Sequence, residues 1–357
     1  MLPSHAESLT PILGWLYQKS GPVIRLRLIR EFGMDPAAEQ ETLAQVLELP
    51  ETQFWLDQLQ ISKRVHDGQC DRLENIAGKL HQLGLAGRTE LFEPYLGDWK
   101  RQLAESRDAT RFFSGYTRAM LCACFSLLGV EHEALLAVAR RRLDVLYDFC
   151  VQRDYDLYLP ENYFGDLPQE RAGKPLVRPE LYPEGTVKLP SIYDVIWFPA
   201  LYRDENRPRI DTVVDYFLAD AYQKGIQPGY GNIREGKRHY YSMGWSVHVP
   251  GFQGFPAIEA RTLVLYMLLL APFAPAVRSA WFACALDYLD TFRTERGTWC
   301  FPRDLLIEKG KSGGYYVLGY HMGLGESRRS PIALELESTY SMLSILQRAG
   351  DSRLRPG

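Results

Sequence analysis

The stretch ALDYLDTFRTERGTWCFP, residues 285–302, joins an apolar segment with helical spacing to a turn that contains tryptophan. Its first half has two earlier counterparts, RLDVLYDF at positions 142–149 and VVDYFL at positions 213–218. Each copy carries an acid between apolar or aromatic neighbours, and the three acids are almost evenly spaced along the chain: Asp144, Asp215 and Asp287. A shorter match, LENI at positions 73–76, precedes the first copy by a similar interval.

An aromatic turn follows the acid of each of the three long copies. It comes about a dozen positions after the acid and contains Tyr155, Tyr230 or Trp299. Repetition at a nearly fixed interval is typical of stacked supersecondary units. The sequence therefore predicts helix pairs with aromatic connections.

The composition is that of an ordinary globular chain with a large core. Of 357 residues, 46% are hydrophobic and 24% are charged, and the formal net charge is −3. Because no global positive field is available to hold a polyanion, nucleic acid is not expected as a partner. The six cysteines are scattered without a CxxC pair, and the chain starts without a signal peptide. A reduced cytoplasmic protein is therefore the simplest interpretation.

Helical spacing dominates the chain, and strand-like alternation is almost absent. Residues 9–30 predict two short helices around Gly21-Pro22. Further helices are expected over residues 71–84, 117–128 and 134–150. Residues 262–277 carry no charge, but they are too few for a membrane span, which needs about 20 apolar residues. They also contain two prolines. We therefore expect a buried core helix there and no transmembrane segment. Arg140-Arg141-Arg142 is interpreted as a solvated helix face.

Residues 160–208 interrupt the helical pattern. They hold eight of the chain's 22 prolines, and they are rich in aromatic residues, which disordered segments lack. This composition predicts a long ordered loop. Such loops are often lids or binding surfaces, and a loop packed over one end of a helical barrel is an equally good alternative.

The turn at residues 285–302 resembles the helix-end turn of the terpenoid cyclase and protein prenyltransferase superfamily, in which a helix runs into a polar residue and then Gly-x-Trp. The usual glutamine of that turn is missing, and Arg293 or Glu295 stands near its place. Three further strings resemble a bacterial branch of squalene-cyclase-like helical proteins: VIRLRLIREFGMDP (residues 23–36), HYYSMGWSVHVPGF (239–252) and LELESTYSMLSILQRAG (334–350).

The resemblance implies an all-α fold of the α/α toroid type, in which inner helices are ringed by outer helices and ligands bind at the centre. At the interval of the repeat the chain has room for about five units, which fits an open or incomplete single-domain ring. The expected organisation is a set of N-terminal helical hairpins over residues 1–110, a toroid core over 111–349 and a flexible tail over 350–357.

Asp154-Tyr155-Asp156-Leu157 is the nearest match to the Asp-x-Asp-Asp motif with which class II terpenoid cyclases protonate a double bond or an epoxide. The last aspartate of the motif is replaced by Leu157, so the network that positions the acid is incomplete. The resemblance implies that Asp154 and Asp156 are catalytic residues. The alternative is a turn, in which aspartate side chains accept hydrogen bonds from the backbone.

Protein prenyltransferases hold zinc through an aspartate, a cysteine and a histidine, for which Asp304, Cys300 and His321 are the available residues. No particular spacing supports this set, and an isolated cysteine is usually a small hydrophobic residue. His66 stands in a second conceivable cluster, VHDGQCD at residues 65–71, which a helix start explains more simply. We therefore predict no metal and no cofactor.

Aromatic residues, histidines and glycines gather between residues 229 and 251. Glycine-rich loops allow a backbone to approach a ligand, aromatic ring faces stabilise cations, and the family uses such rings to steer carbocations. The predicted substrate-binding residues are Tyr230, Tyr240, Trp245, His248, Trp299 and Tyr316. His239 and His321 join the two aspartates as candidate catalytic residues, because histidine titrates near neutral pH. We expect Tyr240, Trp245, His239 and Trp299 to lie near a central cavity; the alternative is that these rings fill the core.

Three functions remain open. The first is a terpenoid-cyclase-like protein that binds an isoprenoid or another apolar substrate in an aromatic cavity, with cyclase or prenyl-transfer chemistry. The second is a non-catalytic helical toroid that binds a hydrophobic small molecule or a protein partner. The third is a carbohydrate-active α/α barrel, which would stack sugars on aromatic rings and use paired carboxylates. Phosphate-binding loops, dinucleotide fingerprints, HExxH and GxSxG motifs are absent from the sequence.

Overall fold

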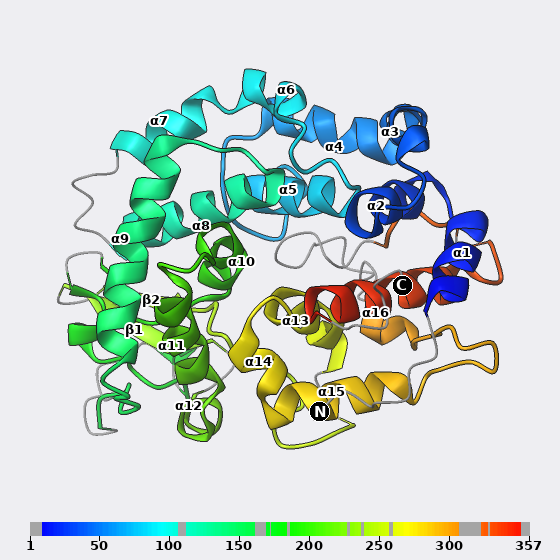
Figure 1. The fold of residues 1–357 in the computed structure, drawn as a ribbon. Coiled ribbons are helices and arrows are strands. Elements are labelled where there is room, and N and C mark those ends of the chain that lie inside the picture. The colour runs from blue at the N-terminus through cyan, green and yellow to red at the C-terminus, as the bar shows by residue number, and fades with distance from the viewer. Residues whose placement is uncertain are drawn as a thin grey trace. The chain divides into compact units, whose positions relative to one another are not determined.

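The computed structural model describes residues 9–105, 112–160, 169–171, 173–183, 186–226, 229–236, 239–256, 260–306, 323–327 and 329–350. Within these ranges the chain forms sixteen α-helices, several short 3-10 helices and one two-stranded sheet (Figure 1). The mostly helical structure agrees with the predicted all-α class. The described helices include none with the length and apolar character that crossing a bilayer requires.

Contacts within the chain divide it into two compact units. Unit 1 comprises Met1–Tyr95, Leu127–Val130 and Pro250–Gly357, and unit 2 comprises Leu96–Ser126 and Glu131–Val249. The predicted division into hairpins, toroid core and tail stays a prediction, and residues 351–357 lie outside the described part.

Ten helices belong to unit 1, within the described residues: α1 (Thr10–Lys19), α2 (Pro22–Phe32), α3 (Glu39–Glu48), α4 (Pro50–Ile61), α5 (Leu73–Gln82), α6 (Thr89–Phe92), α13 (Leu263–Leu270), α14 (Ala274–Arg278), α15 (Ala280–Asp290) and α16 (Ala333–Arg348). The first helices follow the predicted pattern, because Gly21 is the N-cap of α2 and Pro22 is its first residue, where a missing N–H costs nothing. The last described helix, α16, packs against α1, α2 and α13, so helices from the first and last parts of the described chain meet within this unit (Figure 1).

Unit 2 holds the remaining described elements: α7 (Gly97–Glu105), most of α8 (Phe112–Leu128), α9 (Glu133–Cys150), α10 (Ile192–Leu201), α11 (Arg207–Leu218), α12 (Asp220–Gly225), β1 (Gly231–Glu235) and β2 (His239–Met243). Helices α9 and α11 pack side by side (Figure 1). The strands form an antiparallel hairpin with Ile233 opposite Tyr241.

The three copies of the sequence repeat share the same pattern of buried and exposed positions, and each copy lies on a helix. The copies lie in α9, α11 and α15, and their acids are exposed. The residue before each acid and the residue two places after it are buried, as Leu143 and Leu146 show for the first copy. The repeat therefore records amphipathic helices whose acid faces solvent. The short match at residues 73–76 differs, because Glu74 is buried at the start of α5.

Three expectations need correction. Residues 160–208 are not one long loop, because α10 forms within them, started by a capping box between Ser191 and Asp194. Pro199 lies inside this helix, in its last turn. Residues 262–277 form two helices, α13 and α14, because Pro272 ends the helical pattern. The glycine-rich aromatic stretch contains the β1–β2 hairpin, which the sequence pattern did not indicate.

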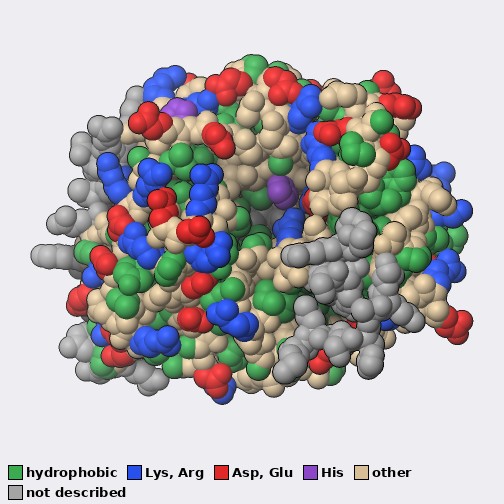
Figure 2. Space-filling model, viewed as in Figure 1, with side chains coloured by type: hydrophobic (Ala, Val, Ile, Leu, Met, Phe, Trp, Pro, Cys, Tyr) green, Lys and Arg blue, Asp and Glu red, His purple; other side chains and the backbone are tan. Residues whose placement is uncertain are grey.

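Charges of both signs are interspersed on the face shown in Figure 2. Neither the basic nor the acidic side chains gather there into one large patch. This distribution agrees with the small net charge of the sequence.

Candidate functional site

Asp154 and Asp156 lie in the turn that follows α9. Asp154 Oδ1 accepts a hydrogen bond from the backbone N–H of Asp156 at 2.9 Å, and its Oδ2 accepts one from Arg178 Nη2 at 2.5 Å. Arg178 Nη1 lies 3.5 Å from Asp156, whose side chain is 77% exposed. The two carboxylates form an ion-paired surface turn, which is the arrangement of the non-catalytic alternative. Their catalytic role stays a prediction.

Tyr230 belongs to a buried cluster of tyrosine rings. Its hydroxyl donates to the carbonyl of Pro190 at 2.6 Å and lies 2.5 Å from the hydroxyl of Tyr222. The Tyr222 ring packs edge-on against Tyr216, whose hydroxyl donates to the carbonyl of Asp154 at 2.7 Å. Burial raises the pKa of both Tyr222 and Tyr230 well above the usual value. These rings, whose hydroxyls are all hydrogen-bonded, fill the core of unit 2.

Trp245 has a backbone φ of 63°, a left-handed conformation that is rare for a bulky residue. Its ring centroid lies 4.7 Å from that of Tyr116 and 6.0 Å from that of Tyr193. Its carbonyl accepts a hydrogen bond from the backbone N–H of Ile192 at 2.9 Å, at the start of α10. Trp245 therefore supports Tyr116 and anchors the beginning of α10.

The remaining predicted residues of unit 2 lie on or after β2. His239 is exposed and pairs in register with Glu235, and Tyr240 is half-buried. His248, which follows the strand, is also half-buried. Neither these three residues nor Tyr230 nor Trp245 lines the cavity of unit 2 described below.

Trp299 belongs to unit 1, where its side chain is buried. Its indole N–H donates to Asp290 Oδ1 at 2.9 Å, and the Arg293 guanidinium lies 5.4 Å from its ring centroid. Its backbone N–H donates to Thr339 Oγ1 at 3.0 Å, which fixes the aromatic turn on α16. His321 and Tyr316 lie outside the described residues. The binding and catalytic roles of these residues stay predictions.

His321, one of the three conceivable zinc ligands beside Cys300 and Asp304, lies outside the described residues. Among the residues that the structure describes, no group of three His, Cys, Asp or Glu side chains is placed to hold an ion. His66 Nδ1 lies instead 2.6 Å from Glu74 Oε1, and Asp67 pairs with Arg72 at 2.8 Å. Cys300 is exposed.

Unit 2 contains a cavity of about 310 Å³ between α8, α9 and α10. Its apolar walls include Ala119, Val138, Val145, Val187 and Trp197. The residues from α9 fall at three- and four-residue spacing, so they lie on one face of that helix. This volume is at the lower end of the range of small-molecule sites.

A buried ion pair holds the cavity wall in place. Arg142 on α9 donates from Nε to Asp194 Oδ1 at 2.9 Å and from Nη2 to Asp194 Oδ2 at 2.8 Å. Arg142 also donates to the carbonyls of Val187 and Leu189. Asp194 is fully buried and accepts further hydrogen bonds from the backbone N–H and the hydroxyl of Ser191, both at 2.8 Å. The pair therefore fastens the segment before α10, and the start of α10, to α9.

Two other guanidiniums line the cavity, Arg118 on α8 and Arg141 on α9. Arg118 is half-buried and Arg141 is exposed. Burial and the charge of Arg141 lower the pKa of Arg118, as expected for a cation that is partly removed from water and has a like charge beside it. Neither has a salt bridge to a described residue. An anion placed between them would relieve this repulsion.

The ionisable groups of the cavity do not favour acid–base chemistry. Besides arginines, its described lining contains Cys122 and Tyr116. Burial raises the pKa of Cys122 and of Tyr116 far above neutrality. A thiol in this state is a poor nucleophile, and neither group exchanges a proton near pH 7.

The sequence interpretation missed this cavity because it assigned Arg140-Arg141-Arg142 to one solvated face. Arg140 and Arg141 are exposed, but Arg142 turns inward. A signal was available: Arg142 lies in the apolar stripe of α9, three residues after Ala139 and four before Leu146, which are both buried. A charge within such a stripe predicts a buried partner.

Compared with models of protein families, with curated proteins and with solved structures, the chain matches none of them.

Proposed function

We propose that the cavity of unit 2 binds an amphipathic anion, with an apolar body against Val138, Val145 and Trp197 and an acidic head group on Arg118 and Arg141. The observation that carries this proposal is the pair of guanidiniums, without a salt bridge to a described residue, beside a mostly apolar cavity of about 310 Å³. Hydrogen bonds to charged groups contribute about 1.5–3 kcal/mol each, and each buried methylene contributes about 0.8 kcal/mol. Both parts of such a ligand therefore add to its affinity.

An isoprenoid diphosphate or acid is one member of this ligand class, and it is the member that fits the terpenoid-cyclase-like resemblance. The α/α toroid belongs to the same proposal; its support is the nearly even repeat marked by Asp144, Asp215 and Asp287, whose copies share one burial register. Binding is favoured over catalysis because of the high pKa of Cys122 and Tyr116. A sugar hydrolase is less favoured, because no carboxylate is among the described residues that line the cavity.

The test is isothermal titration calorimetry with octanoate, octanol and octylammonium, and with geranyl diphosphate as the isoprenoid probe. We expect octanoate to bind more tightly than octanol and octylammonium to bind least. Lengthening hexanoate to octanoate is expected to strengthen binding about fourfold for each methylene.

The test variants are Arg118→Gln and Arg141→Gln. Arg140→Gln is the control, because Arg140 also lies on α9 but is exposed and does not line the cavity. Each of the first two is expected to weaken octanoate binding about tenfold or more, and the control is expected to leave it unchanged. The proposal is wrong if affinity does not depend on the charge of the head group, or if all three variants bind octanoate like the parent protein.

A further inference from the structure

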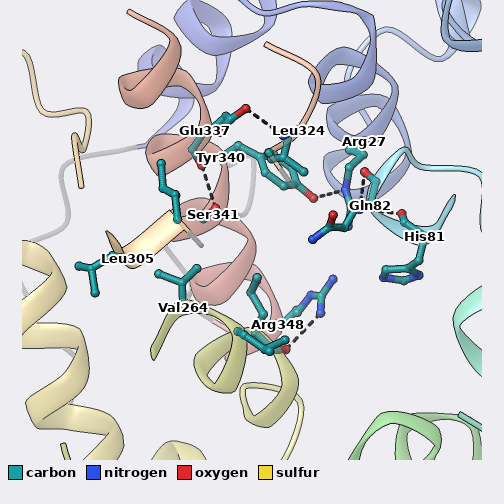
Figure 3. Close-up of a pocket in the computed structure, with 14 residues that line it drawn as sticks. Arg27, His81, Gln82, Val264, Leu305, Leu324, Glu337, Tyr340, Ser341 and Arg348 are labelled. Atoms are coloured by element: carbon teal, nitrogen blue, oxygen red, sulfur yellow. Dashed lines mark hydrogen bonds between the residues drawn. The ribbon is translucent and has the colours of Figure 1, made fainter. Parts of the chain in front are cut away.

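Unit 1 contains a second, smaller cavity, between α2, α5, α13 and α16 (Figure 3). Its volume is about 60 Å³. In Figure 3 the aliphatic side chains of Leu305 and Val264 lie on one side of it, and Gln82 and His81 lie on the other. A cavity of this size holds about four to six water-sized groups.

Arg27 builds the polar wall of this cavity. Its Nη1 donates to the carbonyls of His81 and Gln82 at 2.9 and 3.1 Å, and its Nη2 donates to Glu31 Oε1 at 2.6 Å. Arg27 Nε donates to the hydroxyl of Tyr340, a residue of α16. That hydroxyl in turn donates to Glu31 Oε2 at 2.9 Å. Burial raises the pKa of Glu31, but the charges of Arg27 and Arg348 outweigh burial and lower it to about 2. This network fixes the end of α5 against α2 and α16.

His81 presents a hydrogen-bond acceptor to the cavity. Its Nδ1 lies 3.0 Å from the carbonyl oxygen of Leu127, which can only accept, so Nδ1 carries the hydrogen and Nε2 keeps a lone pair. Burial and the charges of Arg27 and Arg348 lower the pKa of His81 to about 3. The imidazole is therefore neutral at physiological pH and is too weak a base to accept a proton there.

Two further polar groups at the cavity are incompletely bonded within the described residues. Gln82 is 7% exposed, and its Oε1 has no hydrogen-bond partner. Arg348 donates from Nη1 to the carbonyl of Leu268 at 3.1 Å, and it has no ion pair with a described residue. A buried amide oxygen without a partner is unfavourable, so this side of the cavity favours a ligand that carries a hydrogen-bond donor.

From this arrangement we infer that the unit 1 cavity is a second binding site, for a small hydroxycarboxylate. The carboxylate accepts hydrogen bonds from Arg348, the hydroxyl donates to Nε2 of His81, and the short carbon chain lies against Leu305 and Val264. A hydroxyl suits this position better than an amine, because an ammonium group would be repelled by Arg27 and Arg348. Glu337, which also lines the cavity, accepts from the backbone N–H of Leu324 at 2.8 Å, and Figure 3 shows it at the far end from Arg348.

The test titrates the full chain with lactate and with propionate, which lacks only the hydroxyl; lactate has six non-hydrogen atoms and propionate five, so both match the size of the cavity. We expect lactate to bind at least fivefold more tightly than propionate. His81→Phe is expected to remove this difference, and Arg348→Gln is expected to weaken both ligands tenfold or more. Arg278→Gln is the control in the same unit, since Arg278 is exposed and does not line the cavity.

A second measurement uses the unaltered protein, so its result does not depend on whether a variant folds. In protein labelled with ¹⁵N-histidine, the Nε2 resonance of His81 is expected to move when lactate is added and to stay in place with propionate. The inference is overturned if neither acid binds at about 10 mM, if the two bind equally, or if the His81 resonance does not respond. The His81 resonance and the Arg348→Gln variant report on unit 1 alone, so these outcomes are distinguishable from octanoate binding in unit 2.

Discussion

Replacing Asp194 by asparagine removes one charge from the most completely bonded ion pair of unit 2. Asp194 has no exposed surface, and its two oxygens accept from Arg142 Nε and Nη2 and from the N–H and hydroxyl of Ser191. An asparagine of the same shape has one accepting oxygen, so its NH₂ group would face donors. It would also leave the Arg142 charge without its buried partner. Removing one member of a buried pair costs about 3–5 kcal/mol, and we expect a loss of that size in the free energy of unfolding.

The assay is urea unfolding followed by circular dichroism, together with hydrogen exchange of peptides from α9 and α10. The matched control is Asp144→Asn, because Asp144 pairs with Arg209 at 2.6 Å while its side chain is 56% exposed, and such pairs contribute at most about 1 kcal/mol. The double variant Arg142→Met with Asp194→Leu leaves no buried charge unpaired, but it removes the partners of the Val187 and Leu189 carbonyls and of the two Ser191 donors. We therefore expect it to recover only part of the stability that Asp194→Asn loses. A loss below about 1 kcal/mol for Asp194→Asn, or a loss equal to that of the control, would refute the reasoning.

Two further predictions concern pH and backbone geometry. The pKa of His81 is about 3 in the folded chain and about 6.5 in the unfolded chain. Between these pH values the unfolded state binds more protons than the folded state, so the free energy of unfolding falls as the pH falls. Urea unfolding at pH 7, 6, 5 and 4 is expected to show this slope, up to about 1.4 kcal/mol per pH unit, and an unchanged slope in His81→Asn would contradict it. Gly231→Ala is expected to cost more than about 3 kcal/mol, because φ is +125° there and the new Cβ would stand 2.5 Å from the carbonyl oxygen of Pro175. Gly236→Ala is the control, with a positive φ but open space, and thermal unfolding that shows equal losses for the two variants would contradict the steric argument.

Several helices were predictable from sequence because their information is local. The breaker pair Gly21-Pro22 lies between α1 and α2, and the amphipathic repeat lies within α9, α11 and α15 themselves. Helices α3, α4, α6 and α7 were not predicted. The β1–β2 hairpin was missed because its strands mix buried and half-exposed residues without regular alternation. Helix α10 was masked by the prolines around it, although the capping box at its start is a local signal.

The cavities were harder to predict because they depend on contacts between distant residues. Arg142 meets Asp194 across 52 positions, and Arg27 meets Tyr340 across 313. The binding site was predicted at aromatic residues. Two of them, Tyr230 and Trp299, instead have hydrogen-bond partners within the fold and lie in the cores of their units. A sequence pattern identifies an aromatic cluster, and it does not tell whether the rings face one another or an empty space.

Each unit uses its arginines in two different ways. Arg27 and Arg142 each donate to two backbone carbonyls and to a carboxylate, so their charges are compensated within the fold. Arg348 and Arg118 line cavities and have no ion pair with a described residue. Removing a compensated arginine exposes carbonyls and a buried carboxylate, which lowers stability. Removing Arg118 leaves no buried carboxylate without its partner, so such a variant should keep its stability and lose affinity for an anion. That combination distinguishes a binding arginine from a structural one. Arg348 also lowers the pKa of Glu31, so its removal is expected to cost some stability in addition to affinity.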